Sequence, residues 1–182
     1  MIFSYRRRLS RFPQLLAALS LLVLTARADW PAYRNDAERT GYTAEALPIK
    51  LSLQWERHTA KPQPAWPRSS RMTFDFAHQP IASGNMIWFG SSVDGAVHAL
   101  DAKTGHRKWM FFTQSPIRFA PVHWEGALYV GSDDGYLYCL DATTGKLRWK
   151  HRAGPSDEMV LGNGRMISRW PVRGGAAIRE GI

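Results

Sequence analysis

The stretch GAVHALDAKTGHRKW, residues 95–109, recurs forty positions later as GYLYCLDATTGKLRW, residues 135–149. The two copies share seven residues in the same order, namely Gly, Leu, Asp, Ala, Thr, Gly and Trp. A period of about forty residues is the signature of stacked repeat units, which need their neighbours to cover their apolar faces. The chain is therefore expected to be a repeat protein.

Each copy predicts the same series of short strands joined by tight turns. Apolar runs that end in glycine, 86–90 and 128–131, are rich in the aromatic and β-branched residues that strands favour. The Asp-Gly pairs that follow predict hairpin turns, because glycine supplies the positive φ that such turns require. The next strands, 96–101 and 136–141, are apolar at nearly every position, so both of their faces are expected to be covered.

A further turn leads to the last strand of each unit, which carries Trp109 or Trp149. With a leading strand, residues 119–124 in the second copy, the unit becomes a four-stranded antiparallel blade of a β-propeller. The expected fold is thus all-β. The expected organisation is an N-terminal extended segment at 29–50 and a partial propeller at 51–182, with blades at about 74–112 and 117–152 and an incomplete third blade at 172–182.

The pattern Ala-x-Thr-Gly-x-x-x-Trp at 102–109 and 142–149 resembles the tryptophan-docking motif of PQQ-like (pyrrolo-quinoline quinone) β-propeller repeats. The resemblance implies that Trp109 and Trp149 pack between adjacent blades and that the turn before each tryptophan orients it. The stretch DWPAYRND at 29–36, followed by RTGY at 39–42, resembles the mature N-terminus of secreted bacterial members of this repeat class.

The first 28 residues have the pattern of a secretory signal peptide. Arg6, Arg7, Arg8 and Arg11 form a basic region, residues 15–24 an apolar core, and residues 26–28 a small-residue cleavage site. The apolar run of about ten residues is too short to cross a bilayer as a helix. The consecutive arginines leave both general and twin-arginine export open. We expect an exported protein of the periplasm or the extracellular space.

Removing this segment lowers the net charge, because it holds five of the 24 basic residues and none of the 15 acidic ones. The remaining charge of +4 is scattered, and no nucleic-acid-binding motif is present, so nucleic acid is not an expected partner. The lone Cys139 cannot form an internal disulfide, and its counterpart in the first copy is Ala99. A small buried packing position explains both residues.

The chain is too short to close a ring. Residues 29–182 allow fewer than four units of forty residues, whereas closed propellers have four to eight blades. Residues 51–58, with Trp55, are predicted to be the outer strand of a preceding unit. Residues 176–182 align with 121–127, so the chain is expected to be the N-terminal fragment of a longer propeller. Self-association through open blade edges is the alternative.

Two inserts interrupt the repeat and are the candidates for ligand or partner contact, because propellers place function in loops. The first is the proline-rich stretch 61–71 and the second is 155–171. No catalytic or metal-binding residues are predicted. The histidines show no ligand spacing; they are His58, His78, His98, His106, His123 and His151. Asp133 and Asp134 are explained by a hairpin turn. The serines beside glycines, Ser91, Ser92 and Ser132, lack the nucleophile elbow of hydrolases.

The favoured function is a non-catalytic scaffold that binds a protein or polysaccharide partner. The resemblance leaves two alternatives open. One is the N-terminal part of a quinoprotein dehydrogenase that oxidises alcohols or sugars, for which PQQ, a calcium ion and an aspartate base are implied, without matching positions here. The family's alcohol-oxidising members also often carry a disulfide of neighbouring cysteines, whereas Cys139 stands alone. The other alternative is a propeller of the outer-membrane assembly machinery.

Overall fold

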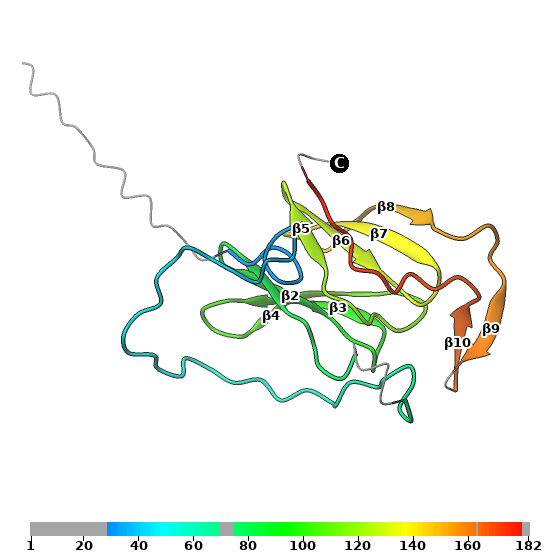
Figure 1. Ribbon diagram of the computed structural model, residues 1–182, viewed down its shortest axis with the longest axis horizontal. Helices are drawn as coiled ribbons and strands as arrows, with labels where there is room; N and C mark the ends of the chain where they lie inside the picture. Colours follow the sequence, from blue (N-terminus) through cyan, green and yellow to red (C-terminus); the bar gives the residue numbers. More distant parts are fainter. Residues whose placement is uncertain (1–28, 70–74, 163, 180–182) are drawn as a thin grey trace, which may run out of the picture.

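The regular elements form two four-stranded antiparallel sheets and a two-stranded hairpin (Figure 1). The computed structural model describes residues 29–69, 75–162 and 164–179, so the expected signal peptide lies outside the described residues. The first sheet holds β1 (Ile81–Ser83), β2 (Met86–Gly90), β3 (Ala96–Asp101) and β4 (Arg107–Phe112). The second holds β5 (Val122–Trp124), β6 (Ala127–Gly131), β7 (Tyr136–Asp141) and β8 (Leu147–Arg152). The hairpin is β9 (Met159–Gly162) and β10 (Arg165–Ser168).

The two large sheets are copies of one blade, as the repeat predicts. Met86 pairs with Asp101 at the start of β2, and Ala127 pairs with Asp141 at the start of β6. The register then shifts at the same place in both copies, between residues 99 and 100 and between residues 139 and 140. A bulge at this position adds twist to the last strand of each blade. The predicted all-β class and the propeller-type blade are confirmed.

The core lies between the two blades, because each sheet turns one apolar face toward the other. Its buried members include Trp88, Val97 and Ala99 from the first blade and Leu128, Val130, Tyr138 and Leu140 from the second. Burying each large side chain contributes about 1.5–3 kcal/mol. Ala99 and Cys139 are 0% and 2% exposed, so the prediction of a small buried position in both copies is confirmed.

A tryptophan of one unit is seated on the turn of the next. The indole nitrogen of Trp109 donates to the carbonyl of Ala142 over 3.1 Å. A Cβ on Gly145, which has φ +72°, would lie 2.6 Å from the Trp109 ring, so only glycine permits this close approach. Trp55 repeats the arrangement one unit earlier, because its indole nitrogen donates to the carbonyl of Ala102 over 2.9 Å. The docking role predicted for Trp109 therefore has a structural basis.

Two expected strands are absent from the described residues. Residues 51–58 are irregular, and Leu51 and Leu53 are 75% and 80% exposed, because no described strand lies beside this stretch for it to pair with. Trp55 of this stretch is seated on the first blade through its indole nitrogen. Residues 172–179 also contain no strand. The second insert, expected to be a loop, instead carries the β9–β10 hairpin, which projects from one end of the molecule in Figure 1.

The N-terminal segment crosses the first strands of both blades. Trp30 exchanges two backbone hydrogen bonds with Ala82 in β1, of 2.7 and 2.9 Å. The amide of His123 in β5 donates to the carbonyl of Pro31 over 2.8 Å. Beyond this point the segment is less extended than expected, because residues 32–38 form turns. The segment thus joins the edge strands of both sheets. Within the described residues, no helix of sufficient length and apolarity to span a bilayer is found.

Candidate functional site

The two inserts meet at one face of the molecule, beside the turns that join β2 to β3 and β6 to β7. The guanidinium of Arg165, on β10, donates to the Oε1 atom of Gln63 over 3.0 Å and to the carbonyl of Val93 over 2.6 Å. The backbone amide of Gln63 in turn donates to the hydroxyl of Ser92 over 2.8 Å. Two loops about a hundred residues apart are therefore fixed to each other and to the first blade. We call this region the insert face.

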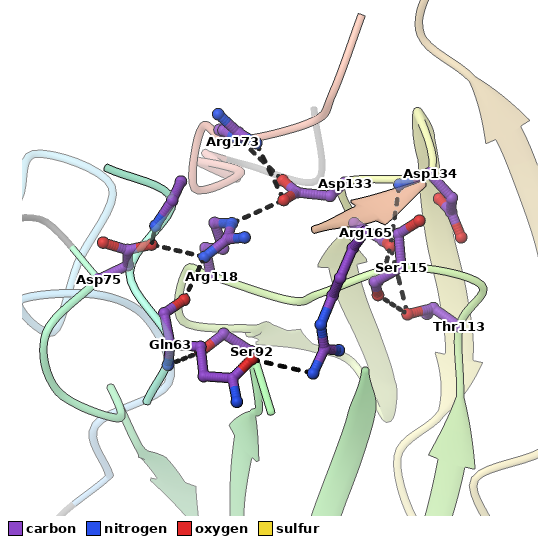
Figure 2. A network of polar contacts seen from close by, with 12 residues as sticks. Gln63, Asp75, Ser92, Thr113, Ser115, Arg118, Asp133, Asp134, Arg165 and Arg173 are labelled. Carbon is purple, nitrogen blue, oxygen red and sulfur yellow. Dashed lines mark hydrogen bonds and ion pairs between the residues drawn. The ribbon is translucent and has the colours of Figure 1, made fainter. Parts of the chain in front are cut away.

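A buried ion-pair network lies beneath the insert face (Figure 2). At its centre, Arg118 has a side chain that is 4% exposed, and it contacts Asp75 at 2.7 Å and Asp133 at 2.6 Å. Arg173 binds Asp133 from the other side, at 2.7 Å. Two positive and two negative side chains thus balance. Because an unpaired buried charge is costly, removal of any one member is expected to be strongly destabilising.

The Arg118 network also holds the first insert in place. Arg118 donates to the carbonyl of Gln63 over 2.6 Å, and the carboxylate of Asp75 accepts the amide of Ala65 over 2.7 Å. Prolines deprive this insert of regular strand pairing. Its backbone is therefore positioned by side chains of the core instead of by a sheet.

The role of Asp133 differs from its predicted one. Asp134 behaves as a turn residue, because its carboxylate accepts the amides of Tyr136 and Gln114. The carboxylate of Asp133 instead binds Arg118 and Arg173. The comparison of the two repeats contains a signal for this, since the first copy has Ser92 and Val93 where the second has only Asp133.

The insert face exposes aromatic, apolar and cationic side chains on this fixed backbone. Trp66 is 38% exposed, and the guanidinium of Arg173 lies 4.6 Å from the centre of its ring. Leu161 and Met166, paired across the β9–β10 hairpin, are 76% and 54% exposed. Beside them an open depression of about 330 Å³ lies between Arg165 and the residues that follow β4. Aromatic, Met and Arg side chains are enriched in protein interfaces.

The structure gives two of the six histidines unexpected surroundings. His98 contacts Asp94 at 3.0 Å through Nε2 and stacks on Phe89, with ring centres 4.8 Å apart, which agrees with a packing role. Burial lowers the pKa of His98, although the carboxylate of Asp94 acts in the opposite direction. Its Nδ1 atom has no hydrogen-bond partner, however, and the same is true of Nε2 of His78. His98 therefore has a hydrogen-bond partner at only one of its two ring nitrogens.

The described residues do not supply a calcium site of the kind that the dehydrogenase alternative implies. Calcium takes six to eight oxygen ligands, several of them from free carboxylates. Asp75 and Asp133 come together through Arg118, and together with Arg173 this arginine balances their two charges. No cluster of three or more His, Cys, Asp or Glu side chains suited to a metal ion occurs in the described part of the chain. Burial also raises the pKa of the Cys139 thiol, so this residue is not an activated nucleophile.

Comparisons with known proteins agree with the repeat and the blade. The model of a PQQ repeat family described as outer membrane protein assembly factor BamB matches residues 113–169. A quinohemoprotein alcohol dehydrogenase from Comamonas testosteroni is 25% identical over 69% of this chain and 19% of its own, with a TM-score of 0.51. BamB from Moraxella catarrhalis is 22% identical over 46% of this chain and 31% of its own, with a TM-score of 0.38. No curated protein gives a match.

The stacked four-stranded blades and the tryptophan seated between them define the class of protein, which is a β-propeller built from repeats. The chain is a PQQ-like repeat protein. It spans 19% and 31% of the length of the two solved chains named above.

Proposed function

We propose that the protein is an exported PQQ-like repeat propeller that acts as a binding or interaction scaffold, with the insert face as its partner surface. The observation that carries the proposal is that the two inserts are fixed together: the Arg118 network holds the first insert, and Arg165 of the second insert binds Gln63 of the first. A preorganised surface loses little conformational freedom on binding. The exposed Trp66, Leu161 and Met166 are suited to be the apolar anchors of such an interface.

Export is part of the proposal, and its support is the pattern of residues 1–28. The matched family description, an outer-membrane assembly factor, agrees with a site of action in the cell envelope. N-terminal sequencing of the protein recovered from a bacterial envelope fraction tests this part. A mature chain that begins at Asp29 is expected, and an uncleaved cytoplasmic product would refute export.

Site-directed cross-linking tests the scaffold. A photo-reactive amino acid at Met166 should give one dominant cross-linked species in envelope extracts, and Leu161→Glu should abolish it. Leu47→Glu is the matched control, since Leu47 and Leu161 are both 76% exposed but Leu47 lies outside the insert face. Equal loss of the species in both variants would contradict the insert face as the partner surface.

Two other functions are supported by specific observations. The likeness to the Comamonas testosteroni enzyme favours a dehydrogenase, and the BamB-type family match favours a role in outer-membrane assembly. Titration with PQQ and calcium tests the first: no absorbance change and no dye reduction with alcohols or sugars would rule it out. The identity of the species cross-linked at Met166 tests the second, because an assembly role requires an assembly component.

A further inference from the structure

A pocket lies on the face of the first blade that points away from the second blade. It has a volume of about 180 Å³ between residues 57–60 and the sheet, and its wall includes Arg57, His58, His78, Phe89, Asp94 and His98. A second, more apolar pocket of about 260 Å³ adjoins it and shares Arg57, His78 and Phe89. Trp55, Pro80, Ile87 and Leu100 complete the apolar part. The two form a single cleft with a polar end and an apolar end.

The polar end contains buried hydrogen-bonding atoms without partners. Over the described residues there are three such side-chain atoms, and two of them, Nε2 of His78 and Nδ1 of His98, are in residues that line this pocket. Buried polar groups in proteins are nearly always paired, so each exception requires an explanation. Two exceptions in the wall of one pocket indicate a shared missing partner.

The existing contacts of the two imidazole rings define which kind of partner is missing. Nε2 of His98 faces the carboxylate of Asp94 at 3.0 Å and Nδ1 of His78 faces the carbonyl of Gly90 at 3.4 Å. Both oxygens are acceptors, so these ring nitrogens carry the hydrogens. In the neutral rings the opposite nitrogens, Nδ1 of His98 and Nε2 of His78, present lone pairs. The missing partner must therefore donate hydrogen bonds.

The second blade shows the same interface in a filled form. His98 corresponds to Tyr138, whose hydroxyl donates to Asp134 over 2.7 Å, as His98 contacts Asp94. The Tyr138 ring contacts Phe111 of the first blade, with ring centres 5.7 Å apart. Phe111 lies two residues after the docked tryptophan of its unit, and the residue at this position in the preceding unit is Arg57. His78 lies three residues before the first strand of its blade, and the residue at this position in the second blade is Phe119. Aromatic packing in one copy is thus replaced by a polar cleft in the other.

We propose that this cleft binds a neutral polyhydroxy molecule, such as a single sugar unit, whose hydroxyl groups donate to His78 and His98. The positive charge of Arg57 would repel a bound cation and the negative charge of Asp94 would repel a bound anion, so a neutral hydrogen-bond donor fits the wall best. The apolar end accommodates the carbon–hydrogen face of a ring. This site does not depend on the proposed role of the insert face.

The test observes the imidazole nitrogens directly. Ring ¹⁵N spectra of the full chain are recorded during titration with D-glucose, D-galactose or glycerol. Saturable shifts of Nε2 of His78 and Nδ1 of His98 with at least one of these probes are expected. The double variant His78→Phe, His98→Tyr installs the residues of the second blade, and it is expected to retain a folded amide spectrum and to bind at least about tenfold more weakly, because both acceptors are lost.

Three outcomes would overturn the proposal. The first is no shift of either ring nitrogen with any of the three probes, which would leave water as the only occupant. The second is a shift with phosphate, methylammonium or Zn²⁺ in their place. The third is unchanged affinity in a folded double variant. If the double variant does not fold, the wild-type ring shifts still decide. The cross-linking at Met166 is a separate readout, so the scaffold and this cleft can fail independently.

Discussion

Trp109 donates its indole N–H to the carbonyl of Ala142, so a side chain of the first blade is bonded to a turn of the second. The same carbonyl also accepts the indole nitrogen of Trp88 over 3.1 Å. Two tryptophans of one blade, on β2 and β4 on either side of Ala99 in β3, thus share one acceptor on the next blade. The blades are joined by directed bonds as well as by apolar contact.

Replacing Trp109 with Phe keeps most of the buried ring and removes the donor. We expect the free energy of unfolding to fall by about 1 kcal/mol, because Ala142 keeps its bond from Trp88. Trp149→Phe is the control at the equivalent position of the second blade, where the side chain is 45% exposed, and its effect should be below about 0.5 kcal/mol. Urea denaturation measures both. Equal effects would contradict the docking role of Trp109.

Gly145→Ala tests the close approach of the turn to Trp109. The substitution meets both an unfavourable φ of +72° and a contact of 2.6 Å to the indole, and together they should cost about 2–5 kcal/mol. Gly164→Ala has the same backbone problem, with φ +73°, but a Cβ there has nothing within 4 Å. It should cost only about 1–2 kcal/mol. The difference between the two variants isolates the packing part, and a difference of zero would refute it.

Arg118→Met should be among the most damaging single substitutions in the described chain. It leaves Asp75 buried without its cation, at an expected cost of about 3–5 kcal/mol. Arg148→Met removes the exposed pair with Asp141 and should cost less than about 1 kcal/mol. Thermal or urea unfolding of both variants makes the comparison. Similar losses would show that the buried network is no more important than a surface ion pair.

The turn aspartate Asp101 should make stability depend on pH in the acid range. The ammonium group of Lys108, with hydrogen bonds from Thr104 and Lys103, lowers the pKa of Asp101 to about 2 from its ordinary 3.8. The fold therefore favours the charged form: its contribution is complete above about pH 4 and is lost as the pH falls through about 2. Unfolding of the wild type and of Asp101→Asn, measured between about pH 5 and about pH 2, should show a shallower decline in the variant. Parallel declines would contradict this assignment.

The repeat allowed the strands and the turns to be predicted, because these features depend on residues close together in the sequence. The seat of Trp109 on the next blade was predicted from the family resemblance, since its contact lies 33 residues away. Trp55 was placed in a strand that does not form, since its docking requires only the turn of the next blade. The Arg118 network was not predicted, because Asp75, Asp133 and Arg173 follow no periodic pattern and meet only after folding. The histidine cleft was likewise missed, although the replacement of Tyr138 by His98 was visible.

The N-terminal segment has a consequence for the order in which the chain folds. Trp30 pairs with Ala82, 52 residues later, and Pro31 accepts from His123, 92 residues later. The hairpins within each blade close over far shorter distances, so they are expected to form first. During synthesis Trp30 can pair only after β1 has emerged from the ribosome, and Pro31 can accept from His123 only after β5 has emerged. The part of the described chain that is synthesised first is therefore expected to complete its contacts last.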